Sequence, residues 1–370
     1  MSEWKEYNLN EVYDFASGLS KGAEEFGFGH GFLGFTDIFK NFFVPNELTS
    51  LVNSTEKEQQ ACSIKRGDVF LTRTSETDED LGMSCVALKD YPKATFNGFT
   101  KRLRPKGNVE ILPEYAGFYF RSPKFRATVS GMSSITTRAS LNNSMLAQLT
   151  IDVPPVEEQK AIAETLISLH RKIALLEKQN ITLESIAETL FCKLIQNVTT
   201  QFELGSLATI SSGKGLKRIE FKDNGIYSVI GANGEIGRTD KYFIDEKVIL
   251  TGRVGTLGKI NIYEDKIWIS DNVLIIKPIN ENYFYPTYFS LKRIDFENLN
   301  VGSTQPLLTQ TDLKKVELNF PDTKSINEFT EQCNTLFSKK TANQIQIKTL
   351  TKQRDSLLPK LMNRDVYITI

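Results

Sequence analysis

Residues 162–194 of this chain read IAETLISLHRKIALLEKQNITLESIAETLFCKL, and a residue of apolar character recurs every third or fourth position except at Asn180. These positions are Ile162, Leu166, Leu169, Ile173, Leu176, Asn180, Leu183, Ala187, Leu190 and Leu194. The same spacing returns 167 residues later, at Phe329, Cys333, Leu336, Lys340, Asn343, Ile347, Leu350, Arg354, Leu357 and Leu361. Two copies of a long a/d seam predict two helices that pair with each other.

Polar residues interrupt both seams. Asn180 does so in the first seam, and Lys340, Asn343 and Arg354 do so in the second. A polar residue at a buried seam position usually costs stability and fixes the register of the pair. Alternatively, these residues lie where the helix pair is frayed or wet, or they face helices of another protein.

The first long helix has a clear predicted start. Pro154-Pro155 stops the preceding strand, and residues 156–196 then contain neither glycine nor proline. Glu157 and Glu158 fall in the first turn, where the helix dipole favours acidic side chains. We therefore expect a helix over residues 156–196.

The second long helix is expected after Pro321-Asp322, with Asp322 or Ser325 as its N-cap. Pro359 should kink or end its last turn. At 1.5 Å per residue, the seam from Ile162 to Leu194 covers roughly 48 Å. An antiparallel pair of such helices would place one globule at each end.

The segments outside the helices also repeat. Leu9-x-x-Val12-x-x-Phe15-x-Ser17-Gly18 matches Leu204-x-x-Leu207-x-x-Ile210-x-Ser212-Gly213, and the strand-like words before Pro154 and Pro321 match as well. The predicted fold is α+β: two mainly β globules separated by two long helices in an antiparallel coiled coil, with an internal pseudo-twofold repeat. The expected domains are a first globule at 1–153, a central helix at 154–197, a second globule at 198–320 and a C-terminal helix and tail at 321–370.

Strand signals are clearest in the second globule. Short β-branched runs at residues 248–250, 258–263, 267–269 and 273–276 are separated by turn formers. The first globule is harder to interpret. Its Gly- and Phe-rich stretch at residues 26–35 fits neither a helix nor a clean strand.

The formal net charge of zero hides a strong segregation of charge. Residues 1–88 hold 7 basic and 15 acidic residues, whereas residues 89–138 hold 10 basic and 3 acidic ones. The basic segment is either a solvated loop or a set of phosphate contacts.

The sequence argues against catalysis in this chain. Its four cysteines are far apart, as in reduced cytoplasmic thiols, and its only histidines are His30 and His170. No apolar run reaches the roughly eighteen residues of a membrane span, and the first residues lack the apolar stretch of a signal peptide. The glycine-rich words at residues 231–237 and 252–260 do not have nucleotide-binding spacing. We expect no catalytic residue, no bound metal and no cofactor.

One motif carries a family resemblance. Val153-Pro-Pro-Val-Glu-Glu-Gln-Lys-Ala-Ile-Ala163, with Leu175-Leu-Glu-Lys-Gln-Asn180 after it, is very similar to the central region of type I restriction-modification specificity subunits. Gly67-Asp68-Val69 and the Arg253-x-Gly255-x-x-Gly258-Lys259 word are also similar to that family. The resemblance covers essentially the full length. The second helix departs from the family pattern because Pro321-Asp-Thr-Lys-Ser-Ile326 replaces its usual Glu-Gln start.

The resemblance implies a function in DNA restriction and modification in the cytoplasm. Each globule would recognise one half of a split, asymmetric site in double-stranded DNA, and the helices would set the gap. Two methyltransferase subunits carrying S-adenosylmethionine would dock on the chain and methylate adenine N6. Motor-nuclease subunits would join for restriction. The alternative is a coiled-coil adaptor, or a silent or inhibitory variant, that binds the methyltransferase without reading DNA.

Candidate DNA contacts are positions that recur in both halves, together with the basic segments. The recurring pairs are Lys21 with Lys214, Arg73 with Arg253, and Ser133-Ser134 with Thr304-Gln305. All the candidates are Lys21, Arg73, Arg102, Arg104, Ser133, Ser134, Arg138, Lys214, Lys217, Arg253, Lys259, Thr304 and Gln305. Ser-Gly and Gly-Ser words among them could equally be turn chemistry. Candidate spacer and partner-helix residues are Glu158, Gln159, Ile162, Leu166, Ile173, Asn180, Lys340, Asn343 and Leu350.

Overall fold

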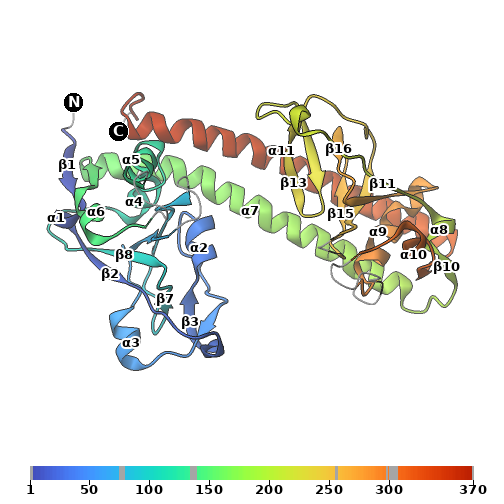
Figure 1. Ribbon diagram of the computed structural model, residues 1–370, viewed down its shortest axis with the longest axis horizontal. Coiled ribbons are helices and arrows are strands. Elements are labelled where there is room, and N and C mark those ends of the chain that lie inside the picture. The colour runs from blue at the N-terminus through green and yellow to red at the C-terminus, as the bar shows by residue number, and fades with distance from the viewer. Residues whose placement is uncertain are drawn as a thin grey trace. The chain divides into compact units, whose positions relative to one another are not determined.

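The computed structural model divides into two compact units (Figure 1). It describes residues 3–74, 80–133, 140–254, 257–296, 299 and 307–368. The first unit comprises Met1–Leu176 and Ile345–Ile370, and the second comprises Glu177–Gln344. Each unit therefore contains one globule and one part of each long helix.

The two predicted long helices are present. They are α7 (Val156–Ile195) and α11 (Thr323–Met362), each 40 residues long and drawn green and red in Figure 1. Every residue of both heptad seams is buried or half-buried. This is the burial that an a/d pattern predicts for helices packed along one face.

The start of α11 follows the sequence. The Asp322 carboxylate accepts hydrogen bonds from the backbone amides of Lys324 and Ser325 at 3.0 and 3.1 Å. Asp322, not Ser325, is thus the N-cap, and it satisfies amide groups that have no partner within the helix. Pro359 lies inside the last turn, and the helix ends at Met362.

The first globule is built on two small sheets and a flanking strand pair. Its sheet orders are β2-β8-β5-β6 and β4-β3-β7, and β1 pairs with β9 in an antiparallel arrangement. The strands are β1 (Lys5–Asn8), β2 (Tyr13–Ser17), β3 (Phe26–Leu33), β4 (Leu51–Val52), β5 (Val69–Thr72), β6 (Ser84–Val86), β7 (Thr95–Phe96), β8 (Thr100–Pro105) and β9 (Thr150–Val153).

The second globule repeats these pairings. Its sheet orders are β11-β17-β14-β15 and β13-β12-β16, and β10 pairs with β18. The pair β12 and β16 is parallel, as is the equivalent pair β3 and β7. The strands are β10 (Gln201–Glu203), β11 (Ala208–Ser212), β12 (Tyr227–Gly231), β13 (Gly234–Thr239), β14 (Val248–Gly252), β15 (Asn261–Tyr263), β16 (Ile267–Ile269), β17 (Val273–Pro278) and β18 (Glu317–Asn319).

Short helices complete each globule and make the class α+β. Those of the first are α1 (Leu9–Val12), α2 (Phe35–Lys40), α3 (Glu56–Ala61), α4 (Pro113–Tyr119), α5 (Pro123–Ser133) and α6 (Asn143–Gln148). Those of the second are α8 (Leu204–Leu207), α9 (Phe284–Lys292) and α10 (Gln310–Lys314). No helix among the described residues is both long and apolar enough to cross a membrane.

The strand predictions hold for the second globule, with one shortened strand. The run at residues 258–263 forms a strand only from Asn261 onward. In the first globule, residues 26–33 of the Gly- and Phe-rich stretch, which fits neither a helix nor a clean strand in sequence, form β3. The strand is irregular: Gly27 and Gly29 have φ of 96° and 95°, and its pairing with β4 shifts between Phe26 and His30. Glycine supplies this backbone conformation at low cost.

Aromatic residues of the first globule pack against the long helices around His170. The ring of His170 in α7 lies 5.4 Å from Phe42 and 5.6 Å from Phe43, centroid to centroid. Arg354 of α11 stacks over Phe42 at 4.9 Å. This polar seam residue therefore contacts the globule of its own unit. Burial, with the nearby arginines, lowers the pKa of His170 to about 4.

We predict that His170→Phe weakens the dependence of the free energy of unfolding on pH between pH 6.5 and about 4. The folded chain holds His170 neutral down to pH about 4, whereas an unfolded histidine takes up a proton near pH 6.5. Wild-type stability should fall between these two pH values because the unfolded state binds the extra proton. Urea unfolding of both proteins from pH 7.5 to pH 4 measures this. Parallel loss of stability in the two proteins would contradict it.

Candidate nucleic-acid interface

The two Ser-Gly words are explained by close backbone contacts. A Cβ on Gly18 would lie 2.2 Å from the carbonyl oxygen of Asn97, and one on Gly213 would lie 2.1 Å from that of Ser270. No side chain fits at such distances. Gly18 and Gly213 therefore have a structural role, because only glycine fits against the neighbouring backbone. This favours the turn interpretation of the Ser-Gly motif over a DNA contact at those two positions.

The lysines that follow these glycines are not equivalent. The amide of Lys214 donates to the carbonyl of Ile269 at 2.8 Å, and in the first globule it is Leu19 that donates to Phe96 at 2.8 Å. Lys21 lies two residues further on and forms an ion pair with Glu58 at 2.8 Å. The Lys21 hydrogen bond lowers the pKa of Glu58 to about 2. The predicted recurrence of these two lysines is thus wrong, because the repeat aligns Lys214 with Leu19.

Arg102 and Arg104 direct their charges into the first globule. Arg102 donates to the carbonyls of Ala61 and Ser63 at 3.2 and 2.8 Å. Arg104 holds the buried Asp68 with two hydrogen bonds of 2.7 and 2.6 Å. A bidentate pair of this kind is a strong, geometrically specific contact.

Arg121, in the same basic segment, is also used inside the globule. Its guanidinium donates to the carbonyls of Ile38, Phe39 and Asn41, each at 2.8 Å. Much of the positive charge in residues 89–138 therefore stabilises the globule. The contacts of Arg102, Arg104 and Arg121 inside the globule explain these arginines without binding to DNA phosphates.

Other candidates lie on the surface of the second globule. Lys214 is exposed, with its Nζ 5.0 Å from the ring of Phe243. Lys217 is exposed and precedes a short 3₁₀ turn, Arg218–Glu220. Lys259 is exposed and donates to the carbonyl of Asn233 at 3.1 Å. Ser134, Arg138, Thr304 and Gln305 lie outside the described residues, and Ser133 is the last residue of α5.

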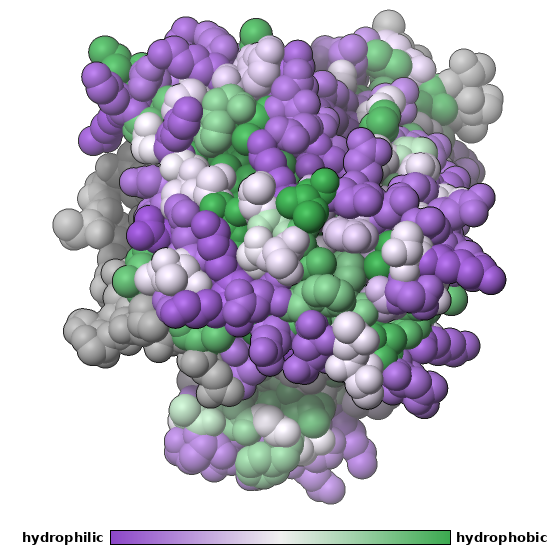
Figure 2. All heavy atoms as spheres, turned by 90° about the vertical axis from the view of Figure 1, so that its right-hand side faces the viewer, coloured by the Kyte–Doolittle hydropathy of each residue, from purple (hydrophilic) through white to green (hydrophobic). Residues whose placement is uncertain are grey.

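The exposed loop at residues 213–222 distinguishes the two globules. It carries Lys214, Lys217, Arg218 and Lys222, with Ile219 between them 86% exposed. The corresponding first-globule segment, residues 18–25, holds one lysine and two glutamates. On the face of the second unit drawn in Figure 2, hydrophobic side chains form separate patches among hydrophilic ones.

Several of the helix candidates form internal contacts. Gln159 is fully buried, accepts a hydrogen bond from the amide of Leu112 at 2.8 Å, and donates to the carbonyls of Glu110 and Pro154. It anchors the start of α7 to the first globule. Glu158 beside it is half-buried, as is Leu350, while Ile162, Leu166 and Ile173 are buried.

Two asparagines meet between α7 and α11 in the second unit. The amide of Asn343 donates to the Asn180 side-chain carbonyl at 2.9 Å, and the two side chains are 1% and 9% exposed. Their seam positions were predicted, but their pairing was not. Buried amides without partners would be costly, so the pair favours one register of α7 against α11.

A charged cluster continues this pairing. Glu184 of α7 forms an ion pair with Lys340 of α11 and accepts a hydrogen bond from the Tyr288 hydroxyl at 2.7 Å. Lys292 lies 3.0 Å from the same carboxylate. Although burial alone would raise it, these hydrogen bonds lower the pKa of Glu184 to about 2. Lys340 is therefore neither frayed nor free for a partner helix in the described part of the chain.

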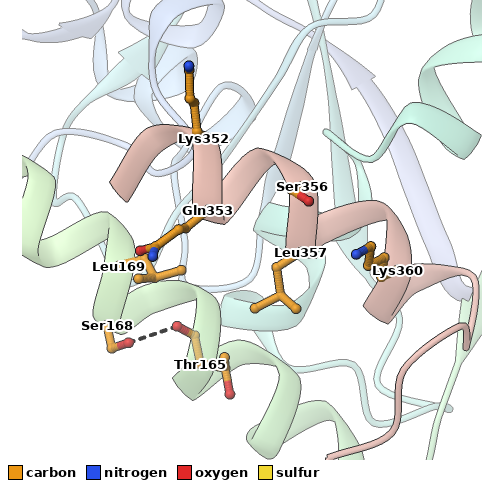
Figure 3. A pocket seen from close by; sticks show the side chains of 8 residues that line it. All are labelled: Thr165, Ser168, Leu169, Lys352, Gln353, Ser356, Leu357 and Lys360. Carbon is orange, nitrogen blue, oxygen red and sulfur yellow. Dashed lines mark hydrogen bonds between the residues drawn. The ribbon is translucent and has the colours of Figure 1, made fainter. Parts of the chain in front are cut away.

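A groove of about 550 Å³ in the first unit is lined by residues of both α7 and α11. Figure 3 shows Leu169 and Leu357 pointing into the space between the helices, and Lys352 pointing away from it. The other lining residues are Thr165, Ser168, Gln353, Ser356 and Lys360.

Comparison with known proteins agrees with this architecture. The sequence matches the family described as the type I restriction modification DNA specificity domain over residues 1–185 and 197–349. It is 26% identical over 359 residues to the type I restriction enzyme MjaIX specificity subunit of Methanocaldococcus jannaschii, covering 84% of this chain and 81% of that protein. It is 21% identical over 474 residues to the HindI specificity subunit of Haemophilus influenzae, covering 99% and 100%.

A solved structure shares the fold. The S subunit of a type I restriction-modification system from M. genitalium aligns with a TM-score of 0.60 at 16% identity, covering 100% of this chain and 97% of that one.

We predict that the two asparagines are energetically coupled. Asn343→Ala should lower the free energy of unfolding by about 1–3 kcal/mol, because the buried Asn180 amide loses its partner. Replacing both by leucine should restore stability or exceed the wild type. Urea unfolding of Asn180→Ala, Asn343→Ala and the double alanine variant measures the coupling energy. The exposed Gln346→Ala on the same helix as Asn343 serves as the control. Additive losses in the double alanine variant would contradict the pairing.

Proposed function

This chain belongs to the family of type I restriction-modification DNA specificity proteins, and we propose that it acts as the non-catalytic subunit that reads the DNA sequence. Each globule recognises one half of a bipartite, asymmetric site in double-stranded DNA. In this proposal the first recognition domain is residues 1–153 and the second is residues 198–320. Residues 154–197 and 321–370 form the connecting helices.

The observation that carries the proposal is a shared framework with different exposed loops. Both globules have the same strand pairings and the same close-packed glycine, at Gly18 and Gly213. They differ in the exposed segment that follows, which is basic in the second globule. Phosphate contacts can be common to two readers, whereas base contacts must differ if the half-sites differ.

The long helices act in this proposal as an antiparallel coiled-coil spacer. Forty residues at 1.5 Å each give a length of roughly 60 Å. Major grooves one helical turn apart on DNA are separated by roughly 34 Å, so a spacer of this length is adequate. The polar contacts of Asn180 and Asn343 support a fixed register, which a spacer of defined length requires.

The partners in this proposal are two methyltransferase subunits that dock on the helices and globules. They carry S-adenosylmethionine and methylate adenine N6 in each half-site, and motor-nuclease subunits join for restriction. The exposed groove with Leu169 and Leu357 supports docking in the first unit, because it leaves apolar side chains between two helices for a partner to cover.

Mapping N6-methyladenine in genomic DNA tests the proposal. The full chain is expressed together with the methyltransferase encoded beside it in a host without other adenine methylation. We expect methylation at one asymmetric sequence made of two parts with a fixed gap. Methylation without a sequence pattern, or none despite a formed complex and an active methyltransferase, would contradict sequence reading.

A salt titration of DNA binding separates this function from that of an adaptor. A subunit that grips several phosphates should lose affinity steeply as salt increases, with a slope of log K against log salt of about −0.9 per phosphate contact. Gel shifts of the assembled complex on the methylated sequence measure this slope. Weak binding at every salt concentration would instead support the adaptor.

A further inference from the structure

Arg73 in the first globule follows directly after β5 and is held by its backbone. Its amide donates to the carbonyl of Phe99 at 2.8 Å, and its carbonyl accepts from the amide of Leu141 at 2.8 Å. The next residue, Thr74, forms an isolated antiparallel bridge with Ser140. Three segments that are far apart in sequence therefore meet at this arginine and fix where its side chain starts.

Arg253 in the second globule follows β14 and is held in the same way. Its amide donates to the carbonyl of Asn272 at 2.8 Å, and its carbonyl accepts from the amide of Leu308 at 2.9 Å. Val254 forms an isolated bridge with Leu307. Two globules with diverged sequences thus keep an arginine on the same backbone frame.

The side chains of both arginines are half-buried, and among the described residues neither side chain has a hydrogen-bond or ion-pair partner. In particular, the Nε of Arg253 is buried and has no hydrogen-bond partner in the part of the chain that the structure describes. Arg104 and Arg121 show what this chain does with structural arginines: it pairs them with a carboxylate or with several carbonyls. An arginine kept for packing should show similar contacts, because unpaired buried donors are costly.

A second cation lies beside Arg73. Lys101 is 8% exposed, and its Nζ donates to the hydroxyl of Ser17 at 3.0 Å and to the amide oxygen of Asn143 at 2.9 Å. Both acceptors are neutral. Burial and the field of Arg73 lower the pKa of Lys101. Two neighbouring cations with neutral acceptors are a place where a bound anion would be stabilised.

The second globule keeps the arginine without the lysine. Lys101 pairs with Ser17 across β8 and β2, and the equivalent pair across β17 and β11 is Leu274 with Ser212. The hydroxyl of Ser212 instead accepts a hydrogen bond from Gln310 at 2.8 Å. Arginine is therefore the cation common to both sites, and lysine is an addition in the first.

We propose that Arg73 and Arg253 are a matched pair of DNA phosphate anchors, one in each globule, and that Lys101 strengthens the first. This inference rests on the proposed function. A residue common to two globules that read different half-sites cannot choose between their bases, which favours the sugar-phosphate backbone as its target. The planar guanidinium can bind phosphate oxygens with two parallel hydrogen bonds.

Glutamine variants in the assembled methyltransferase complex test the pair. Arg73→Gln and Arg253→Gln should each reduce the salt slope of DNA binding by about 0.9, and the double variant by about 1.8. Affinity should fall by a similar factor for the methylated sequence and for unrelated DNA, and the methylated sequence should stay the same. Lys101→Met should weaken DNA binding in the wild type and in Arg253→Gln, but less in Arg73→Gln, because its effect depends on the phosphate that Arg73 holds.

Arg66→Gln is the matched control. It removes one arginine charge from the first globule, but Arg66 already forms an ion pair with Glu114 at 2.9 Å, so the salt slope should match the wild type. Thermal unfolding of each variant separates lost contacts from lost folding. A wild-type slope in the folded Arg73 and Arg253 variants, or a changed methylated sequence, would overturn the phosphate assignment. If the wild-type complex itself shows no sequence preference, the proposed function fails instead.

Discussion

The structure depends on the burial of the apolar seam that runs along one face of each long helix. In the first unit, Ile162 and Leu166 of α7 share a core with Leu358 and Leu361 of α11. In the second, Ala187 and Phe191 share a core with Phe329 and Cys333. Seams of this kind specify that the helices pair, but apolar contacts alone tolerate shifts along the axis. The Asn180–Asn343 hydrogen bond and the Glu184–Lys340 ion pair add the directional contacts that resist such a shift.

The charges of the chain divide into two groups with different roles. One group, which includes Arg102, Arg104 and Arg121, stabilises the first globule through carbonyl and carboxylate contacts. The other group is either exposed, as in the loop at residues 213–222, or has no side-chain partner among the described residues, as at Arg73 and Arg253. A formal net charge of zero is therefore compatible with local attraction for a polyanion, because the field at a surface depends on where charges lie.

The long helices and the internal repeat were predictable because each rests on a local, periodic signal. Heptads, proline stops and the Asp322 cap are all contained within short windows of sequence. The pairing of Asn180 with Asn343 was not predictable, because both lie on seams but their register depends on contacts across 163 residues. The inward direction of Arg102 and Arg104 was missed for a similar reason: Asp68 and Ser63 reach them only in the fold. A count of charged residues along the sequence does not show which of them form ion pairs or hydrogen bonds in the fold.

The alignment of equivalent sites also needed the structure. Lys21 and Lys214 follow the same word, yet the backbone hydrogen bonds align Lys214 with Leu19. Arg73 and Arg253 were predicted as DNA contacts because they recur in the two halves, and that correspondence holds in the backbone hydrogen bonds of each residue. A residue that recurs directly after a continuous strand, such as Arg73 and Arg253, therefore occupies the same structural position in both globules. A residue that recurs after a loop of different length, such as Lys21 and Lys214, does not.

The central claim, that paired helices set the distance between two half-sites, is tested most directly by lengthening both helices together. One heptad is inserted after Leu176 in α7 and one after Gln344 in α11, where the two units divide. Seven residues add roughly 10 Å of helix, equivalent to about three base pairs at roughly 3.4 Å each. Methylation mapping should then return the same two half-sites with a longer gap. An unchanged gap, or altered half-sites, would contradict the account.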